Sequence, residues 1–223
     1  PYDSWTSAAN VIQDAVDLAD AGDLILVNNG IYARGGRVMA GDLTNRVAVD
    51  KAVALMSVSG PSATIIQGEW DVPSTNGPGA VRGVWLGDEA AIFGFTVRGG
   101  ATRGLVGDGI NLQTGGGVWC NSTNARVVGC IIRGGAAGAT GGGAFGGVFR
   151  GTLISSLIHD NQGAGVGFSS MINCTVTGNG LSGSGGGLVA AITNLIHNSI
   201  IWGNGTSPPG GTAAQHFGGP FSY

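Results

Sequence analysis

The chain has 223 residues, 45 of them glycine, and only 10% of its residues are charged, with a formal net charge of −3. This length fits one domain, and the low charge excludes nucleic-acid binding, which needs a basic surface. No run of residues approaches the ~18 apolar residues that span a membrane, so we expect no membrane insertion. The glycine content, far above its usual ~7%, indicates many tight turns.

The first predicted element is an amphipathic helix over residues 7–21. Ser7 can serve as its N-cap and Gly22 as its stop, and one stripe of the helix is apolar. Because the open end of a solenoid must be covered, we expect this helix to form an N-terminal cap. Strands are predicted next, near 24–27, 47–58 and 64–66.

A seven-residue phrase then recurs along the chain. It reads NSIIWGN at 198–204 and NCTVTGN at 173–179, and weaker copies lie at 155–161, 129–135 and 94–100. A second phrase, which begins as GVWL and GVWC in its first two copies, precedes each copy by 8 to 12 residues. Two phrases in fixed order at a period of 18 to 35 residues predict one structural unit, repeated with loops of variable length.

The alternation within the phrase predicts a strand rather than a helix. Its second and fourth positions are small or apolar and its fifth is mostly polar, so positions two and four share one face and position five the other. Parallel coils stacked ~4.8 Å apart place equal positions above one another. Asn161, Asn179 and Asn204 then form one column, in which their amides can hydrogen-bond from rung to rung.

These repeats, the segments 7–32 and 46–68, and the closing NSIIWGN resemble the right-handed parallel β-helix proteins of the pectate-lyase-like superfamily. More narrowly, they resemble secreted bacterial β-helix proteins of the choice-of-anchor type. The resemblance covers about residues 5–204. It implies an all-β solenoid of about seven rungs, and a bacterial protein that is extracellular or on the cell surface. We expect residues 1–204 to form a single β-helix domain and 205–223 to be a Gly/Pro-rich tail outside the repeats.

The resemblance leaves the activity open, because this superfamily includes lyases, hydrolases, adhesins and proteins without chemistry. Such lyases need a carboxylate cluster holding Ca²⁺ and a basic residue, and the hydrolases need close carboxylates. No two coils carry carboxylates at equivalent outward positions. Arg98, Arg133 and His159 do form a column with Asp160 adjacent, which is the best candidate for catalysis or anion binding. A solvated outer face is the simpler interpretation.

Two outward apolar stripes are also predicted. Trp85, Trp119 and Phe145 form one, for which a covering loop or tail, a subunit contact and stacking on sugar rings are three alternatives. The third position of the repeated phrase forms the other, and Trp202 occupies position five of the last copy. The residues of this second stripe are Thr96, Ile131, Leu157, Thr175 and Ile200.

The three cysteines, Cys120, Cys130 and Cys174, are an odd number. Cys130 and Cys174 are separated by the rung of Ser156, a distance of about 9.6 Å at rung spacing, whereas a disulfide tolerates ~7 Å between Cα atoms. We therefore predict buried free thiols and no metal site, because paired Cys-x-x-Cys spacing and clustered histidines are absent from the sequence.

Two functions fit these features. The sequence favours a secreted or cell-surface structural β-helix protein without catalytic activity or cofactor, whose partner is itself and which self-associates into oligomers or a filament. The alternative is a polysaccharide lyase or hydrolase, or a non-catalytic glycan-binding protein, acting on extracellular polysaccharide. Among these functions, only that of a lyase would require Ca²⁺ as a cofactor.

Overall fold

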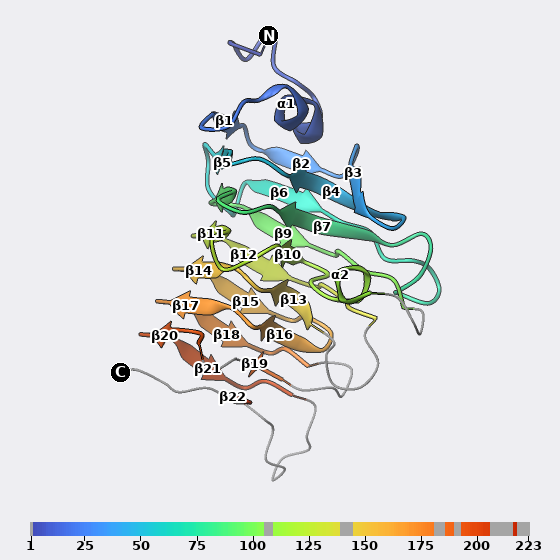
Figure 1. Ribbon diagram of the computed structural model, residues 1–223, viewed down its shortest axis with the longest axis vertical. Helices are drawn as coiled ribbons and strands as arrows, with labels where there is room; N and C mark the ends of the chain where they lie inside the picture. The colour runs from blue at the N-terminus through green and yellow to red at the C-terminus, as the bar shows by residue number, and fades with distance from the viewer. Residues whose placement is uncertain are drawn as a thin grey trace.

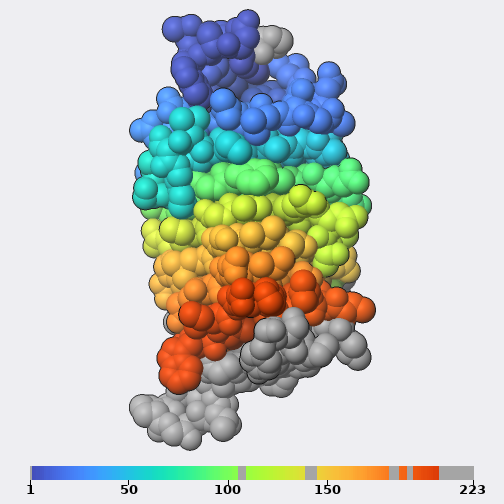
Figure 2. Space-filling model, turned by 90° about the vertical axis from the view of Figure 1, so that its left-hand side faces the viewer, coloured from blue at the N-terminus to red at the C-terminus, as the bar shows by residue number. Residues whose placement is uncertain are grey.

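The computed structural model describes residues 2–104, 109–138, 145–180, 186–189 and 193–205, together with the backbone of 216–217. The chain winds into a rod whose coils follow one another from the N-terminal to the C-terminal end (Figure 1). In the space-filling view the coils form successive bands across the rod (Figure 2). Three parallel sheets run along its length.

Among the described residues, sheets A and B have seven strands each, which confirms the prediction of about seven rungs. Sheet A consists of β1 (Leu24–Val27), β5 (Ala54–Ser57), β8 (Ala91–Phe93), β11 (Arg126–Val128), β14 (Thr152–Ile154), β17 (Ser170–Ile172) and β20 (Ile196–His197). Sheet B consists of β2 (Gly30–Tyr32), β6 (Thr64–Gln67), β9 (Thr96–Arg98), β12 (Ile131–Arg133), β15 (Leu157–His159), β18 (Thr175–Thr177) and β21 (Ile200–Trp202).

Sheet C has eight strands, the first of which, β3, pairs antiparallel with β4 while the rest are parallel. The strands are β3 (Arg37–Ala40), β4 (Leu43–Val49), β7 (Val81–Leu86), β10 (Val118–Cys120), β13 (Phe145–Phe149), β16 (Ala164–Gly167), β19 (Leu188–Val189) and β22 (His216–Phe217). Each coil therefore has three strands. The two phrases of the sequence account for sheets B and C, and the strands of sheet A lie just before each copy of the first phrase.

Each copy of the repeated phrase forms one corner and one strand of its coil. Its first and sixth positions have positive φ in all five copies, as at Asn173 (56°) and Gly178 (63°). Glycine and asparagine adopt this left-handed conformation most readily, which explains their recurrence there. The fourth position points into the core, where Val97, Ile132 and Ile158 are 0% exposed.

The core is a stack of short aliphatic side chains between the three sheets. Each fully buried valine, leucine or isoleucine contributes about 1.5–3 kcal/mol from removal of its surface from water. Sheet A supplies Leu55, Ile92, Val127, Leu153 and Met171, sheet B supplies Ile66, Val97, Ile132, Ile158 and Val176, and sheet C supplies Val47, Val84, Val118, Val148 and Val166.

Four strands of sheet C carry a glycine immediately before the inward valine, at Gly83, Gly117, Gly147 and Gly165. A Cβ on Gly117 would lie 2.7 Å from the Ile132 side chain of sheet B, and one on Gly83 would lie 2.4 Å from the Val97 side chain of sheet B. These glycines let sheet C approach sheet B more closely than any side chain would allow.

The cap helix is shorter than predicted. Helix α1 spans Ile12–Leu18, its N-cap is Val11, and no side chain caps it. Ser7 instead bonds to Asp3 and Ser4 within an N-terminal arm and closes a turn there, so it does not cap the helix. Gln13 anchors α1 to β4, since it accepts from the Ala48 N–H (2.7 Å) and donates to the Ala48 carbonyl (3.1 Å).

A short helix, α2 (Ile110–Gln113), lies between β9 and β10, and residues 105–108 lie outside the described part. One further prediction needs correction. The tail, expected to contain no rung, contributes β22, which pairs with β19 in sheet C. A strand of two residues is too short to produce a recognisable repeat in the sequence. The remaining tail residues 206–215 and 218–223, and residues 139–144, lie outside the described part.

Candidate functional site

Asn161, Asn179 and Asn204 form a buried column at the corner between sheets B and C. The Asn161 side-chain N–H donates to Asn179 Oδ1 (2.8 Å), and the Asn179 side-chain N–H donates to Asn204 Oδ1 (2.9 Å). Asn179 also donates to the carbonyls of Ile158 (2.9 Å) and Thr177 (3.0 Å). Each amide thus joins its own coil to the next, which is a structural role.

On the outer face of sheet C, Trp85 and Trp119 are register neighbours whose rings stack with centroids 5.5 Å apart and planes 14° apart. Trp119 is only 6% exposed. An indole so deeply covered has no open face for a sugar ring, which leaves the half-buried Trp85 as the accessible end of the stack.

The third member of this column is Phe149 rather than Phe145, because β13 pairs Phe149 with Trp119. The predicted alignment chose GAFG, but the later GVF at 147–149 repeats the same Gly-Val-aromatic pattern as GVW. Phe145 packs beside the column, against Phe149 (5.3 Å between centroids) and Phe168 (5.6 Å). Its ring occupies the space that a side chain on Gly167 would need.

Arg82 closes one side of the aromatic column and is 2% exposed. Its guanidinium donates to Asn45 Oδ1 (2.8 Å) and to the carbonyls of Asn111, Thr114 (3.0 Å) and Gly115 (3.0 Å). Burial lowers the pKa of Arg82 to about 9, so the group stays charged at neutral pH. One buried cation therefore fastens the 111–115 segment over sheet C. Its only trace in the sequence is an arginine before GVW.

The outer face of sheet B carries the predicted cation column. Arg98, Arg133 and His159 are register neighbours. Arg98 donates to Gln67 Oε1 (2.7 and 3.0 Å), and His159 Nδ1 lies 2.8 Å from Asp160 Oδ2. Arg133 is exposed, and no ion pair joins it to another described residue.

A tryptophan that the sequence analysis did not single out joins this face. Trp70, in the 68–80 loop, is 39% exposed, and its indole N–H donates to the Gly134 carbonyl (3.1 Å). That bond places a partly exposed indole at the backbone of the residue that follows Arg133. An indole and a guanidinium on one surface can together bind a planar or cyclic anion.

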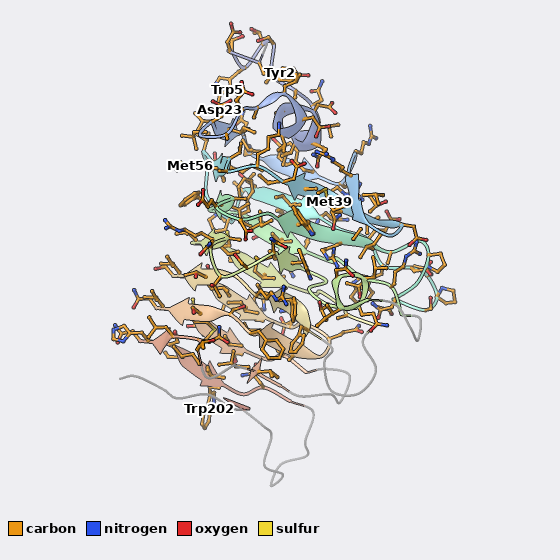
Figure 3. The ribbon with its side chains drawn as sticks, in the orientation of Figure 1. Tyr2, Trp5, Asp23, Met39, Met56 and Trp202 are labelled. Carbon is orange, nitrogen blue, oxygen red and sulfur yellow. The ribbon has the colours of Figure 1, made fainter. Side chains whose placement is uncertain are left out.

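The second apolar stripe also lies on sheet B. Thr96 is buried, while Ile131, Leu157 and Thr175 are half-buried. The last member, Ile200, is 62% exposed, and Trp202 is 74% exposed. The stripe is thus largely covered by its own neighbours along the rod and open only at the C-terminal end, where Trp202 projects from the last coil of sheet B (Figure 3).

The N-terminal end is apolar too. Tyr2 and Trp5 lie beyond α1 (Figure 3), and a groove of about 900 Å³ separates this arm from α1 and β1. Exposed apolar residues at this end, with their exposed fractions, are Tyr2 39%, Trp5 55%, Leu18 59%, Leu24 53%, Leu26 50%, Ile31 59% and Met56 37%.

Cys120, Cys130 and Cys174 are free and buried. Burial raises the pKa of all three thiols, that of Cys130 to about 11. Within the described part of the chain, no three His, Cys, Asp or Glu residues come together as a metal site. No helix found there is long and apolar enough to span a bilayer.

No known family profile and no curated protein matches the sequence. Among solved structures, pectate lyase Pel9A aligns with 98% of this chain at 14% identity and a TM-score of 0.60, and this chain spans 57% of that protein. Weaker similarities are to the A-module of the Azotobacter vinelandii mannuronan C-5 epimerase AlgE4 (15% identity, 86% of this chain and 45% of that one, TM-score 0.37) and to ORF18 of Geobacillus virus E2 (12%, 94% and 57%, 0.28).

At such identities the likeness to the lyase establishes the fold and no more. Together with the three parallel sheets, it confirms the predicted architecture. The chain is a right-handed parallel β-helix, a fold that it shares with pectate lyase Pel9A.

Proposed function

We propose that this chain is an extracellular or cell-surface structural β-helix that associates end to end with further copies of itself. One observation carries the proposal: exposed large apolar side chains gather at the two ends of the rod. Ile31 at one end and Ile200 and Trp202 at the other are each more than half exposed. Apolar patches on soluble proteins mark interaction surfaces.

The sheets add a second reason. Sheet B begins with β2 and ends with β21, and neither has a further strand beyond it among the described residues. A terminal strand presents unpaired backbone groups that another chain can pair with. A contact between two different ends of one molecule is heterologous, and it propagates when it does not close into a ring.

The test is sedimentation velocity and negative-stain microscopy of the purified chain over a concentration series. We expect rods that lengthen with concentration. The double variant Ile200→Asp/Trp202→Asp should remain monomeric, whereas Val72→Asp, a control at an 85% exposed loop position, should assemble normally. Single compact rods of the unaltered chain at every concentration would rule the proposal out.

A second function is favoured by the Trp70 and Arg133 arrangement. The fold is shared with a protein named as a pectate lyase. The exposed Trp70 indole, bonded to Gly134, and the register neighbours Arg98 and Arg133 suit an acidic polysaccharide, by ring stacking and charge. In this proposal the outer face of sheet B binds an extracellular acidic glycan, with or without cleavage.

Titration with pectate and with neutral dextran, with and without Ca²⁺, tests this second function. We expect pectate alone to bind, with a loss of at least tenfold in Trp70→Ala and Arg133→Ala. The control Arg126→Ala alters an exposed arginine on sheet A and should leave binding unchanged. Equal binding by all variants would remove this site from consideration, and unsaturated uronide among the products would establish lyase activity.

A further inference from the structure

We infer that the groove at the N-terminal end binds an extended, basic peptide, which adds one strand to the open edge of β1. The occupant is a segment of another protein in which apolar residues alternate with lysine or arginine. The inference concerns sheet A. It goes beyond the proposed end-to-end association and does not depend on it.

The groove has the size and the walls that such a peptide needs. Its volume of about 900 Å³ lies within the ~300–1,000 Å³ usual for binding pockets, and every residue of β1 lines it. Apolar walls are formed by Trp5 of the N-terminal arm, Leu18 of α1, and Leu24 and Leu26 of β1. All four side chains are at least 50% exposed, so covering them is favourable.

Helix α1 leaves the edge of β1 to the groove. Its Gln13 bonds to both backbone groups of Ala48 in β4 (2.7 and 3.1 Å), which holds α1 over the core next to sheet C. β1 belongs to sheet A and lies at the end of the rod (Figure 1), with no strand beyond it among the described residues. A single strand in the groove therefore lies beside α1 and takes no place in sheet C.

The backbone of β1 has unpaired groups on the groove side. Alternate residues of a parallel strand bond to opposite neighbours. The carbonyls of Asp23 and Val27 both accept from the β5 side, at 3.0 Å. The N–H and C=O groups of Leu24 and Leu26 therefore face the open edge. Such an edge is a template for one further strand.

The same strand sets the side-chain pattern of the peptide. Leu24 and Leu26 point to the outer face, whereas Ile25 packs against the core. An added strand continues both columns, so alternate residues of the peptide point outward and inward. The inward ones meet Ile25 and the small Ala15 and Ala19 of α1, which also line the groove. We therefore expect these inward residues to be apolar.

The charge of this end favours a basic peptide. Asp3 and Asp23 line the groove, and no lysine or arginine is among its described lining residues. Residues 1–33 contain five aspartates and no basic residue. A lysine or arginine that points outward from the peptide can approach these carboxylates with its charge, while its aliphatic stem covers Leu24 and Leu26.

Two capped peptides of six residues test the inference, one alternating lysine and valine and the other glutamate and valine. Isothermal titration of the unaltered chain, kept dilute enough to be monomeric, should show saturable binding of the basic peptide. The acidic peptide should bind at least tenfold more weakly. Amide exchange followed by NMR should slow at Leu24 and Leu26 and stay unchanged at Val176 in β18. Equal binding of the two peptides, or none of either, would overturn the inference.

The basic peptide with every backbone nitrogen methylated separates strand addition from attraction between charges alone. It keeps the lysines but has no N–H groups to donate to the Leu24 and Leu26 carbonyls. We expect at least a tenfold loss of affinity. Binding as tight as that of the unmethylated peptide would show that no strand is added to β1.

The double variant Asp3→Asn/Asp23→Asn tests the contribution of charge. Asparagine keeps an oxygen to accept from the Ser7 hydroxyl and the Asp20 N–H, so the fold is retained. We expect the basic peptide to bind at least fivefold more weakly. Glu89→Gln, at an exposed position outside the groove, is the matched control and should bind as the unaltered chain does. Equal affinities of the two variants would contradict recognition by the groove carboxylates.

Discussion

Trp85 and Trp119 lie one coil apart on the outer face of sheet C, with nearly parallel rings 5.5 Å between centroids. Together with Phe145, Phe149, Ala164 and Val189 they form an apolar cluster separate from the core inside the coils. The rod therefore has a second, external core on one of its three sides, and this core is part of what holds neighbouring coils together.

Trp119→Ala should destabilise the chain by about 3–5 kcal/mol, the range for removing a buried large aromatic side chain. Guanidinium unfolding followed by circular dichroism measures this. Trp202→Ala, at a position 74% exposed, is the control and should change stability by no more than about 0.5 kcal/mol, measured where the chain is monomeric. Equal effects of the two substitutions would contradict a buried external core.

Asn179→Ala should cost more than a single hydrogen bond, because Asn179 occupies the middle of the amide column. Its loss removes the Oδ1 acceptor of both the buried Asn161 backbone N–H (3.2 Å) and the Asn161 side-chain N–H (2.8 Å). Each unsatisfied buried group costs about 1–3 kcal/mol, so we expect a loss of about 2–5 kcal/mol in urea unfolding.

Asn124→Ala is the control for this substitution, since Asn124 is exposed and its only described hydrogen bond uses its backbone N–H. Its stability should be unchanged. A loss at Asn179 no larger than at Asn124 would mean that the column contributes nothing.

Arg82→Lys should loosen the 111–115 segment although it keeps the charge. The guanidinium serves four acceptors at once, and a single ammonium cannot reach them in the same geometry. Hydrogen exchange by mass spectrometry should show faster exchange at 110–116 and no change at 170–177. Arg126→Lys, at an exposed strand position, should not change this exchange. If Arg82→Lys protected 110–116 as well as the unaltered chain does, Arg82 would not fasten this segment.

The thiols make stability depend on alkaline pH. Because burial raises the pKa of Cys130 to about 11, the folded state favours the protonated thiol. This contribution is complete below the ordinary thiol pKa of ~8.5 and is lost as pH rises from there toward 11. We expect the urea midpoint to fall between pH 8.5 and 10.5, and less so in Cys130→Ala.

The same burial predicts slow labelling. A thiol reagent at pH 8 should modify none of the three cysteines in the folded chain and all three in urea. Cys120 and Cys130 are both at most 1% exposed, so their packing implies that the coils rarely open. Rapid labelling of the folded chain would contradict this.

The sequence predicts the structure well where stacked coils require similar residues at the same position of the repeated phrase. The asparagine column and the Arg98–Arg133–His159 column follow from the repeat alone, since identical phrase positions must lie above one another. The first two strands of sheet A lie within the predicted strands near 24–27 and 47–58. Its strands in the repeated coils were missed because they are short, such as Thr152–Ile154, and merge with the turn that opens the next phrase.

What could not be predicted depends on contacts between segments without a repeat. The choice between Phe145 and Phe149 is decided by a register shift in β13, which a Gly-rich stretch does not reveal. Likewise, the Trp70 bond and three of the four Arg82 bonds end on backbone carbonyls. These groups are the same for every residue type, so the sequence does not reveal such bonds.

The shortest coil shows how such a rod can grow. From Leu157 to its register partner Thr175 the chain advances 18 residues, and in that span it contributes strands to all three sheets and one asparagine to the column. A duplication of this unit would add one complete coil with every column kept in register, whereas the longer coils differ mainly between sheets B and C. The length of the rod and the shape of its surface can therefore change independently. Copying whole coils, in evolution or by design, changes the length, whereas altering a single loop changes the surface.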